Sequence, residues 1–164
     1  MTLAGGGDRM SSDGVRPAPS EGRPCQVRLR NGERVTVRAV TPADEPALAD
    51  FLASLCLEAR RMRFFSGGVD VATMARYAAA GGPERAGLLA LDQSASVVGH
   101  AFYVELAPGR AEVAVEVADR LHGHGLGTIL IERLAQLAER RGITRFSAEV
   151  LPDNRAMLDV FRDG

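Results

Sequence analysis

Three apolar segments separated by very short turns constrain the fold of this chain most. Residues 87–91, 97–106 and 111–117 are mostly apolar, and Val, which is common in strands, recurs in the last two. The connections between them contain Asp92-Gln93-Ser94 and Pro108-Gly109, which are turn-forming sequences. Connections this short join neighbouring antiparallel strands. We therefore expect a three-stranded antiparallel meander in the middle of the chain.

The residues before the meander predict a hairpin followed by helices. Asn31-Gly32 lies between two short stretches of alternating Val and Leu and predicts a tight β-hairpin, because both turn residues tolerate positive φ. Thr41-Pro42 then suits the N-cap and first position of a helix. Two more helices are expected over residues 57–64 and 71–80.

The residues after the meander predict a crossover back to the sheet. Residues 127–140 form an amphipathic helix pattern that ends at Gly142, and residues 144–150 read as a strand. A strand reached through a helix runs parallel to the strand that it follows. A last helix is expected over residues 154–162. The fold class is therefore α+β, with one mixed sheet (an antiparallel meander plus a parallel crossover) flanked by helices.

Composition and charge describe one globular domain. The chain has 164 residues, of which 46% are apolar, and a net charge of -1, which gives no reason to expect binding to nucleic acid or to a membrane. Residues 1–24 contain almost no large apolar side chains, so we expect a disordered tail before a domain over 25–164. The N-terminus has no apolar export segment, and no apolar run is long enough to span a membrane, so a cytoplasmic location is expected.

Few residues suit metal binding or covalent catalysis. His122, His124 and His100 are too few and too scattered to predict a metal site. Cys56 lies on an apolar helix face, and Cys25 has no evident base beside it, so neither is expected to be a nucleophile. All 20 basic residues are arginine, so the chain holds no lysine side chain to modify in itself.

A glycine-rich loop separates the meander from the amphipathic helix and reads His122-Gly123-His124-Gly125-Leu126-Gly127-Thr128. Glycines let the backbone approach a ligand closely, and the first amides of a helix attract anions, most naturally phosphate. The loop lacks the Lys of a Walker A motif and the glycine spacing of a dinucleotide-binding fingerprint. By itself, the spacing also fits a flexible turn.

In this setting the loop resembles the acetyl-CoA-binding motif of the GNAT superfamily of N-acetyltransferases, Gln/Arg-x-x-Gly-x-Gly/Ala. Gly125 and Gly127 match the motif, whereas His122 stands where Gln or Arg is usual. A second signature of that superfamily is an Asn that opens a helix, with a Tyr seven positions later. Asn154 matches it, and Phe161 replaces the Tyr. The resemblance covers residues 25–164.

Within the superfamily, the chain is most similar to the GNAT module of bacterial protein lysine acetyltransferases of the Pat type. Residues 61–66, 111–115 and 154–162 carry this resemblance. It implies acetyl-CoA as cosubstrate and a protein partner, an acyl-CoA synthetase, that carries the acceptor lysine; no metal is expected, because the histidines are too few. The GNAT fold normally continues with two more strands after the last helix, so the sequence ending at Gly164 is expected to be a fragment.

The reaction needs a base, because a lysine amine with a pKa near 10.4 is mostly protonated at neutral pH. Glu112 matches the general-base Glu of the GNAT protein acetyltransferases, although an exposed strand carboxylate is the alternative interpretation. Glu116 shares its strand face but lies about 13 Å further along a regular strand, too far to act as a close pair. At that distance we interpret Glu116 as a supporting or substrate-facing residue. Amides near Val115 and Val117 would polarise the thioester carbonyl.

The resemblance also implies which residues contact the cosubstrate and the protein substrate. Without a hydroxyl at Phe161, the thiolate would leave unprotonated or take a proton from water. Arg61 and Arg63 form a basic cluster that either is a solvated face or docks an acidic patch of the protein substrate. The expected acetyl-CoA contacts are Val115, Val117, His122, Gly123, His124, Gly125, Gly127, Thr128, Asn154 and Phe161.

Three functions remain open at this point. The first is protein lysine acetylation by direct attack of the amine on the thioester. The second is acetylation of a small-molecule amine with the same cosubstrate site. The third is a non-catalytic module that senses acetyl-CoA, against which an intact Glu112 argues.

Overall fold

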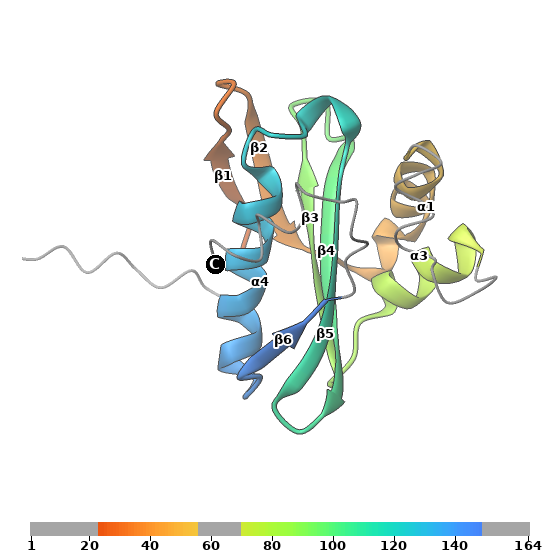
Figure 1. Ribbon diagram of the computed structural model, residues 1–164. Coiled ribbons are helices and arrows are strands. Elements are labelled where there is room, and N and C mark those ends of the chain that lie inside the picture. The colour runs from red at the N-terminus through yellow and green to blue at the C-terminus, as the bar shows by residue number, and fades with distance from the viewer. Residues whose placement is uncertain (1–22, 56–69, 149–164) are drawn as a thin grey trace, which may run out of the picture.

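A computed structural model describes residues 23–55 and 70–148, which form one open, six-stranded mixed sheet (Figure 1). The strands lie in the sheet in their sequence order. Neighbours are antiparallel from the first strand to the fifth, and the sixth runs parallel to the fifth. The strands are β1 Cys25–Arg28, β2 Arg34–Ala39, β3 Arg85–Leu91, β4 Val97–Ala107, β5 Arg110–Val117 and β6 Arg145–Ser147.

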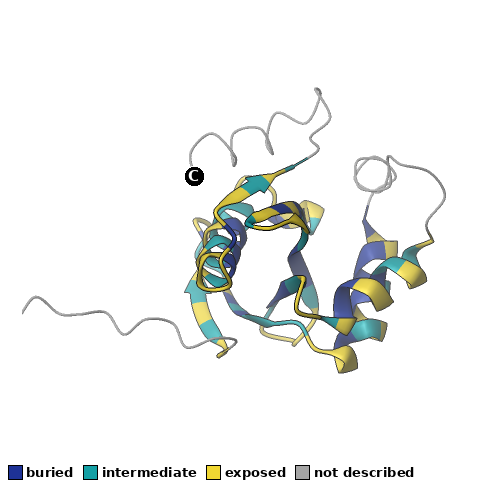
Figure 2. Ribbon diagram, turned by 90° about the horizontal axis from the view of Figure 1, so that it is seen from below, coloured by how far each residue is buried: buried dark blue, intermediate teal, exposed yellow. Residues whose placement is uncertain are grey.

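Helices cover both faces of this sheet. α4 (Leu126–Arg140) packs on one face, and α1 (Glu45–Ser54) and α3 (Val71–Ala80) pack together on the other (Figures 1 and 2). Short 3₁₀ turns, η1 (Pro42–Asp44) and η2 (Asp119–Leu121), precede α1 and the loop before α4. The predicted α+β fold, with its meander and its parallel crossover, is confirmed.

Alternation along the strands divides the interior into two cores. On β3, Leu88 and Ala90 belong to the core beneath α4, whereas Leu89 belongs to the core beneath α1 and α3. Gly99 on β4 lets α4 lie close to the sheet, since an added Cβ would sit 3.0 Å from the Leu130 side chain. This close packing fixes the N-terminal half of α4 against the centre of the sheet.

The start of the first helical segment is held by a partly buried ion pair. The Asp44 carboxylate accepts hydrogen bonds from Thr41 N–H at 2.8 Å and from the Thr41 hydroxyl at 2.9 Å. Arg38 on β2 donates both ends of its guanidinium to Asp44, at 2.7 and 2.8 Å. These hydrogen bonds, and most of all those from Arg38, lower the pKa of Asp44 to about 2. The predicted start at Thr41-Pro42 is confirmed, with a 3₁₀ turn before α1.

The hairpin predicted at Asn31-Gly32 is confirmed, because β1 and β2 pair as antiparallel neighbours. Its turn is one residue longer than the expected two-residue turn. Leu29 N–H donates to Glu33 O at 2.8 Å and Gly32 N–H donates to Leu29 O at 2.9 Å, so residues 30–32 form the loop. Within this loop only Gly32 has positive φ, at 86°, whereas the expected turn needs positive φ at both of its residues. Asn31 instead uses its side chain, whose Oδ1 accepts from Glu33 N–H at 3.0 Å. Asn often stabilises a loop this way, by bonding the backbone two residues on.

Several other expectations can be compared with the described residues. The helix predicted over 71–80 is confirmed, and the meander strands differ from their predicted bounds by no more than two residues. The last predicted strand is described only as Arg145–Ser147. The predicted helices over 57–64 and 154–162, and nearly all of the tail, lie outside the described residues. Within the described ranges, no helix is long and apolar enough to cross a membrane.

Candidate functional site

The edge of β5 that faces away from β4 offers backbone groups to a ligand. Ala118 N–H donates to Val98 O at 2.9 Å, which makes this a hydrogen-bonded pair of the antiparallel ladder. Hydrogen-bonded and non-hydrogen-bonded pairs alternate along such a ladder. The backbone groups of Val113, Val115 and Val117 therefore point away from β4, toward the β6 side.

β6 covers only the beginning of that edge. It pairs with Arg110, Ala111 and Glu112, and the last matched residues are Glu112 and Ser147. In the described part of the chain, which ends at residue 148, no strand pairs with β5 beyond this point. The N–H and carbonyl of Val115 and the N–H of Val117 are thus placed to pair with an extended ligand.

The glycine loop connects this edge to the N-terminus of α4. Gly123 and Gly125 have φ of 77° and 89°, a region in which side chains other than glycine are strained. Gly125 is the N-cap of α4, and its carbonyl accepts the first helical bond, from Ile129 N–H at 3.1 Å. Gly127 and Thr128 lie in the first turn, so their N–H groups precede the first helical donor. The loop therefore has the backbone geometry of an anion site.

His122 lies across the end of the β5 edge. Its Nε2–H donates to the Val117 carbonyl at 2.9 Å, and the side chain is exposed. This carbonyl belongs to the outward-facing set on β5. The structure thus brings His122 and Val117, both predicted cosubstrate contacts, directly together.

The two glutamates of β5 share a face but differ in surroundings. Glu112 is exposed and stands at the position where β6 ends its pairing with β5. Glu116 is buried, with its Oε2 3.1 Å from Nδ1 of His100 on β4. His100 in turn stacks on Phe102, with ring centroids 5.4 Å apart. Sequence reasoning missed the pairing of His100 with Glu116, although a His and a Glu on neighbouring apolar strands could have suggested it.

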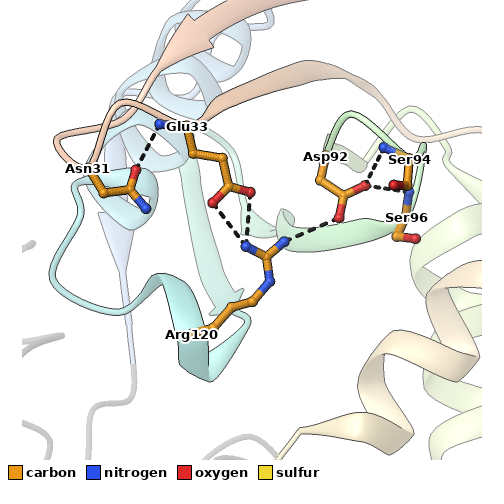
Figure 3. Close-up of polar contacts among 6 residues, drawn as sticks. All are labelled: Asn31, Glu33, Asp92, Ser94, Ser96 and Arg120. Carbon is orange, nitrogen blue, oxygen red and sulfur yellow. Dashed lines mark hydrogen bonds and ion pairs between the residues drawn. The ribbon is translucent and has the colours of Figure 1, made fainter.

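The β1–β2 loop also lies against the glycine loop. Arg30 N–H donates to His124 O at 3.1 Å. Arg120, in η2, donates to both carboxylate oxygens of Glu33 at 2.9 Å and to Asp92 at 3.2 Å (Figure 3). Nothing in the sequence spacing signals these contacts, because Glu33 and Arg120 are 87 positions apart.

Four of the predicted site residues, Arg61, Arg63, Asn154 and Phe161, lie outside the described residues. Among those described, no group of three or more His, Cys, Asp or Glu side chains is arranged to hold a metal ion. The described site therefore consists of the β5 edge, the glycine loop, Glu112 and the neighbouring β1–β2 loop.

A family model of the acetyltransferase (GNAT) family matches residues 55–164. The chain belongs to the GNAT family. The family uses acetyl-CoA, and the site fits that molecule, because the β5 edge suits its amide-bearing pantetheine arm and the glycine loop suits its phosphates. This GNAT domain is accordingly an N-acetyltransferase by family.

Several solved structures are similar to this domain. It is similar to the GNAT domain of S. lividans PAT, with 32% identity over 85% of both chains and a TM-score of 0.77. It also resembles a cAMP-binding acyltransferase from Mycobacterium smegmatis, with 25% identity and a TM-score of 0.62. That match covers 87% of this chain but 42% of the mycobacterial one. A putative phosphinothricin N-acetyltransferase, 17% identical, shares the fold.

Proposed function

We propose that this GNAT domain transfers an acetyl group from acetyl-CoA to a lysine side chain of a protein, and that an acyl-CoA synthetase is the substrate. The similarity to the GNAT domain of S. lividans PAT, which extends over 85% of both chains, carries this proposal. The Pat-type sequence features over 61–66 and 111–115 support it. We propose a cytoplasmic location for the protein, as the sequence predicts.

Glu112 is the proposed general base. Deprotonating a lysine amine at pH 7 costs about 4.6 kcal/mol, so a positioned base removes much of the barrier. Glu112 is exposed at the point where β5 loses its β6 partner, so an incoming amine can reach its carboxylate. The proton passes to Glu112 directly or through one water molecule.

The edge of β5 is the proposed place for the thioester. Acetyl-CoA supplies an acetyl carbon activated by sulfur. The N–H of Val115, the nearer of the two outward-facing groups to Glu112, would stabilise negative charge on the carbonyl oxygen. The N–H of Val117, about 7 Å further along the strand, would bind the next part of the cosubstrate. As the amine nitrogen bonds to the carbonyl carbon, the C–S bond breaks and the thiolate departs with the electron pair. A CoA thiol with a pKa near 8.5 can leave without a tyrosine at Phe161.

The remaining predicted residues have supporting roles in this proposal. The glycine loop, with His122, His124 and Thr128, binds the phosphates, and Asn154 and Phe161 complete the cosubstrate contacts. Glu116, buried in its pair with His100, would support the site by holding β4 and β5 together rather than by facing the substrate. Arg61 and Arg63 dock an acidic patch of the protein substrate.

The test uses the 164-residue chain, acetyl-CoA and a panel of purified acyl-CoA synthetases. Thiol release is followed in solution, and acetyl-lysine on the synthetase is located by mass spectrometry. Because the chain contains no lysine, side-chain self-acetylation adds no background. Acetylation of a synthetase lysine supports the proposal. Turnover only with small amines would contradict it in favour of a small-molecule transferase, and binding without turnover on any amine would indicate a sensing module.

A further inference from the structure

We propose that Arg30, in the β1–β2 loop, binds a phosphate group of acetyl-CoA beside the glycine loop. This inference rests on the proposed use of acetyl-CoA at that loop. It adds a binding residue from the β1–β2 hairpin, which lies far from the glycine motif in the sequence. No sequence motif links the two segments.

The first observation is where Arg30 lies. Its N–H donates to His124 O at 3.1 Å, so the hairpin loop is joined to the glycine loop by a backbone hydrogen bond. Its side chain continues along Gly125, the N-cap of α4. A Cβ placed on Gly125 would be 3.6 Å from Arg30 Nε and 3.9 Å from its Cγ and Cδ. The Arg30 side chain therefore lies beside the N-cap residue of α4, the helix whose first N–H groups have no partner within the helix.

The second observation is that this cation is uncommitted. The Arg30 side chain is exposed, and within 23–55 and 70–148 no carboxylate or carbonyl accepts from it. Arg120, the arginine of the η2 segment, is instead paired with the carboxylates of Glu33 and Asp92 (Figure 3). Those ion pairs neutralise the carboxylates of Glu33 and Asp92, which would otherwise repel a phosphate. The Asp119 carboxylate lies 3.8 Å from Nε2 of His122 in the glycine loop. Among the described residues, Arg30 is an exposed arginine beside the glycine loop that has no acidic partner.

The third observation is that the loop is held in position before any ligand arrives. Both oxygens of Glu33 accept from Arg120 at 2.9 Å, and Leu29 N–H donates to Glu33 O at 2.8 Å. Asn31 closes the loop through its bond to Glu33 N–H. A loop that is already ordered loses little freedom on binding, so its contact with the ligand is stronger. Arginine suits the task because its planar fork matches phosphate oxygens.

The experiment is a calorimetric titration of acetyl-CoA into the chain and into Arg30→Gln. The matched control is Arg28→Gln, which removes the same charge from the same hairpin but at a side chain that lies over Gly32. We expect Arg30→Gln to raise Kd roughly tenfold, Arg30→Lys to raise it less, and Arg28→Gln to leave it within about twofold. Thermal unfolding of each variant checks that the fold is retained.

A second titration, with acetyl-3′-dephospho-CoA, identifies the phosphate. A penalty for Arg30→Gln that disappears with this ligand assigns Arg30 to the 3′-phosphate, and a penalty that persists assigns it to the diphosphate. Equal affinity of Arg30→Gln and Arg28→Gln for acetyl-CoA would overturn the inference about Arg30 alone. Failure of the unmodified chain to bind acetyl-CoA would overturn the proposed function as well, so the two failures are distinct.

Discussion

Glu112 and Glu116 lie on one face of β5, and their surroundings assign them different tasks. Glu112 is exposed where β6 ends its pairing, whereas Glu116 is 7% exposed and bonded to His100. A carboxylate that accepts a proton from a substrate must be reachable by it. A buried carboxylate that is bonded to an imidazole on the next strand is better placed to hold β4 and β5 together than to accept a proton from a substrate. The alternation of side chains along β5 was predictable from the sequence, but this difference in burial was not.

Replacing Glu112 by Gln should therefore slow the chemistry and spare binding. Gln keeps the shape of the side chain but cannot take a proton, so kcat should fall by roughly 10²–10⁴-fold. The Kd for acetyl-CoA, measured by calorimetry, should remain within about twofold, because the carboxylate is not a proposed cosubstrate contact. Glu139→Gln, an exposed position near the C-terminal end of α4, is the matched control. If Glu112→Gln kept a kcat within a few-fold of the control, Glu112 would not be the base.

Glycines near the two ends of α4 have nearly the same φ. Substituting each one therefore distinguishes the effect of backbone strain on stability from an effect on acetyl-CoA binding. Gly125 has φ of 89° before the helix, and Gly142 has φ of 84° after it. Alanine at either position costs about 1–2 kcal/mol in the left-handed region. Gly125→Ala should also weaken acetyl-CoA binding several-fold, because its Cβ lies beside the first helical amides and Arg30. Gly142→Ala should lower stability similarly and leave Kd unchanged. Equal Kd values for the two variants would contradict the assignment of the phosphate loop.

The connection between β2 and α1 should be sensitive to acid. Arg38 holds the pKa of Asp44 at about 2, below its ordinary value of 3.8. A carboxyl with a lowered pKa adds stability that is complete above the unfolded pKa and is lost as pH falls through the folded pKa. Asp44 should thus contribute about 2 kcal/mol at pH 7 and progressively less between pH 4 and pH 2.

Urea unfolding of the chain and of Asp44→Asn across that pH range measures this contribution. The difference in unfolding free energy between them should be largest near neutral pH and should shrink toward pH 2. Thr41→Val is a useful comparison, since it removes the hydroxyl that also donates to Asp44 but leaves the Arg38 ion pair. A difference that stayed constant from pH 7 to pH 2 would show that Asp44 acts through something other than its charge.

At the scale of the whole molecule, local patterns predicted the elements and missed the contacts between distant ones. Short turns and apolar alternation were enough for the meander, and the helix over 126–140 began one residue before its expected position. Asn31-Gly32 was enough to predict the β1–β2 hairpin, but it gives no sign of the contacts that this loop makes with distant residues. Glu33 meets Arg120, and Arg30 meets Gly125, only once the sheet is assembled. The glycine motif of the site was therefore predictable from the sequence, but the contacts that the β1–β2 loop makes with the motif were not.

Because the proposed site joins the β5 edge, α4 and the β1–β2 loop, acetyl-CoA should stabilise the whole domain. A ligand present at 100 times its Kd adds about 2.7 kcal/mol to a state that alone binds it. For a chain of this length, that corresponds to a rise in Tm of roughly 5–10 °C. Thermal unfolding with saturating acetyl-CoA should show this rise, and Arg30→Gln should shift the titration to higher ligand concentrations. NAD, which also carries adenosine and a diphosphate, is the control ligand and should produce no comparable rise. An equal rise with NAD would mean that the glycine loop binds diphosphates without selecting acetyl-CoA.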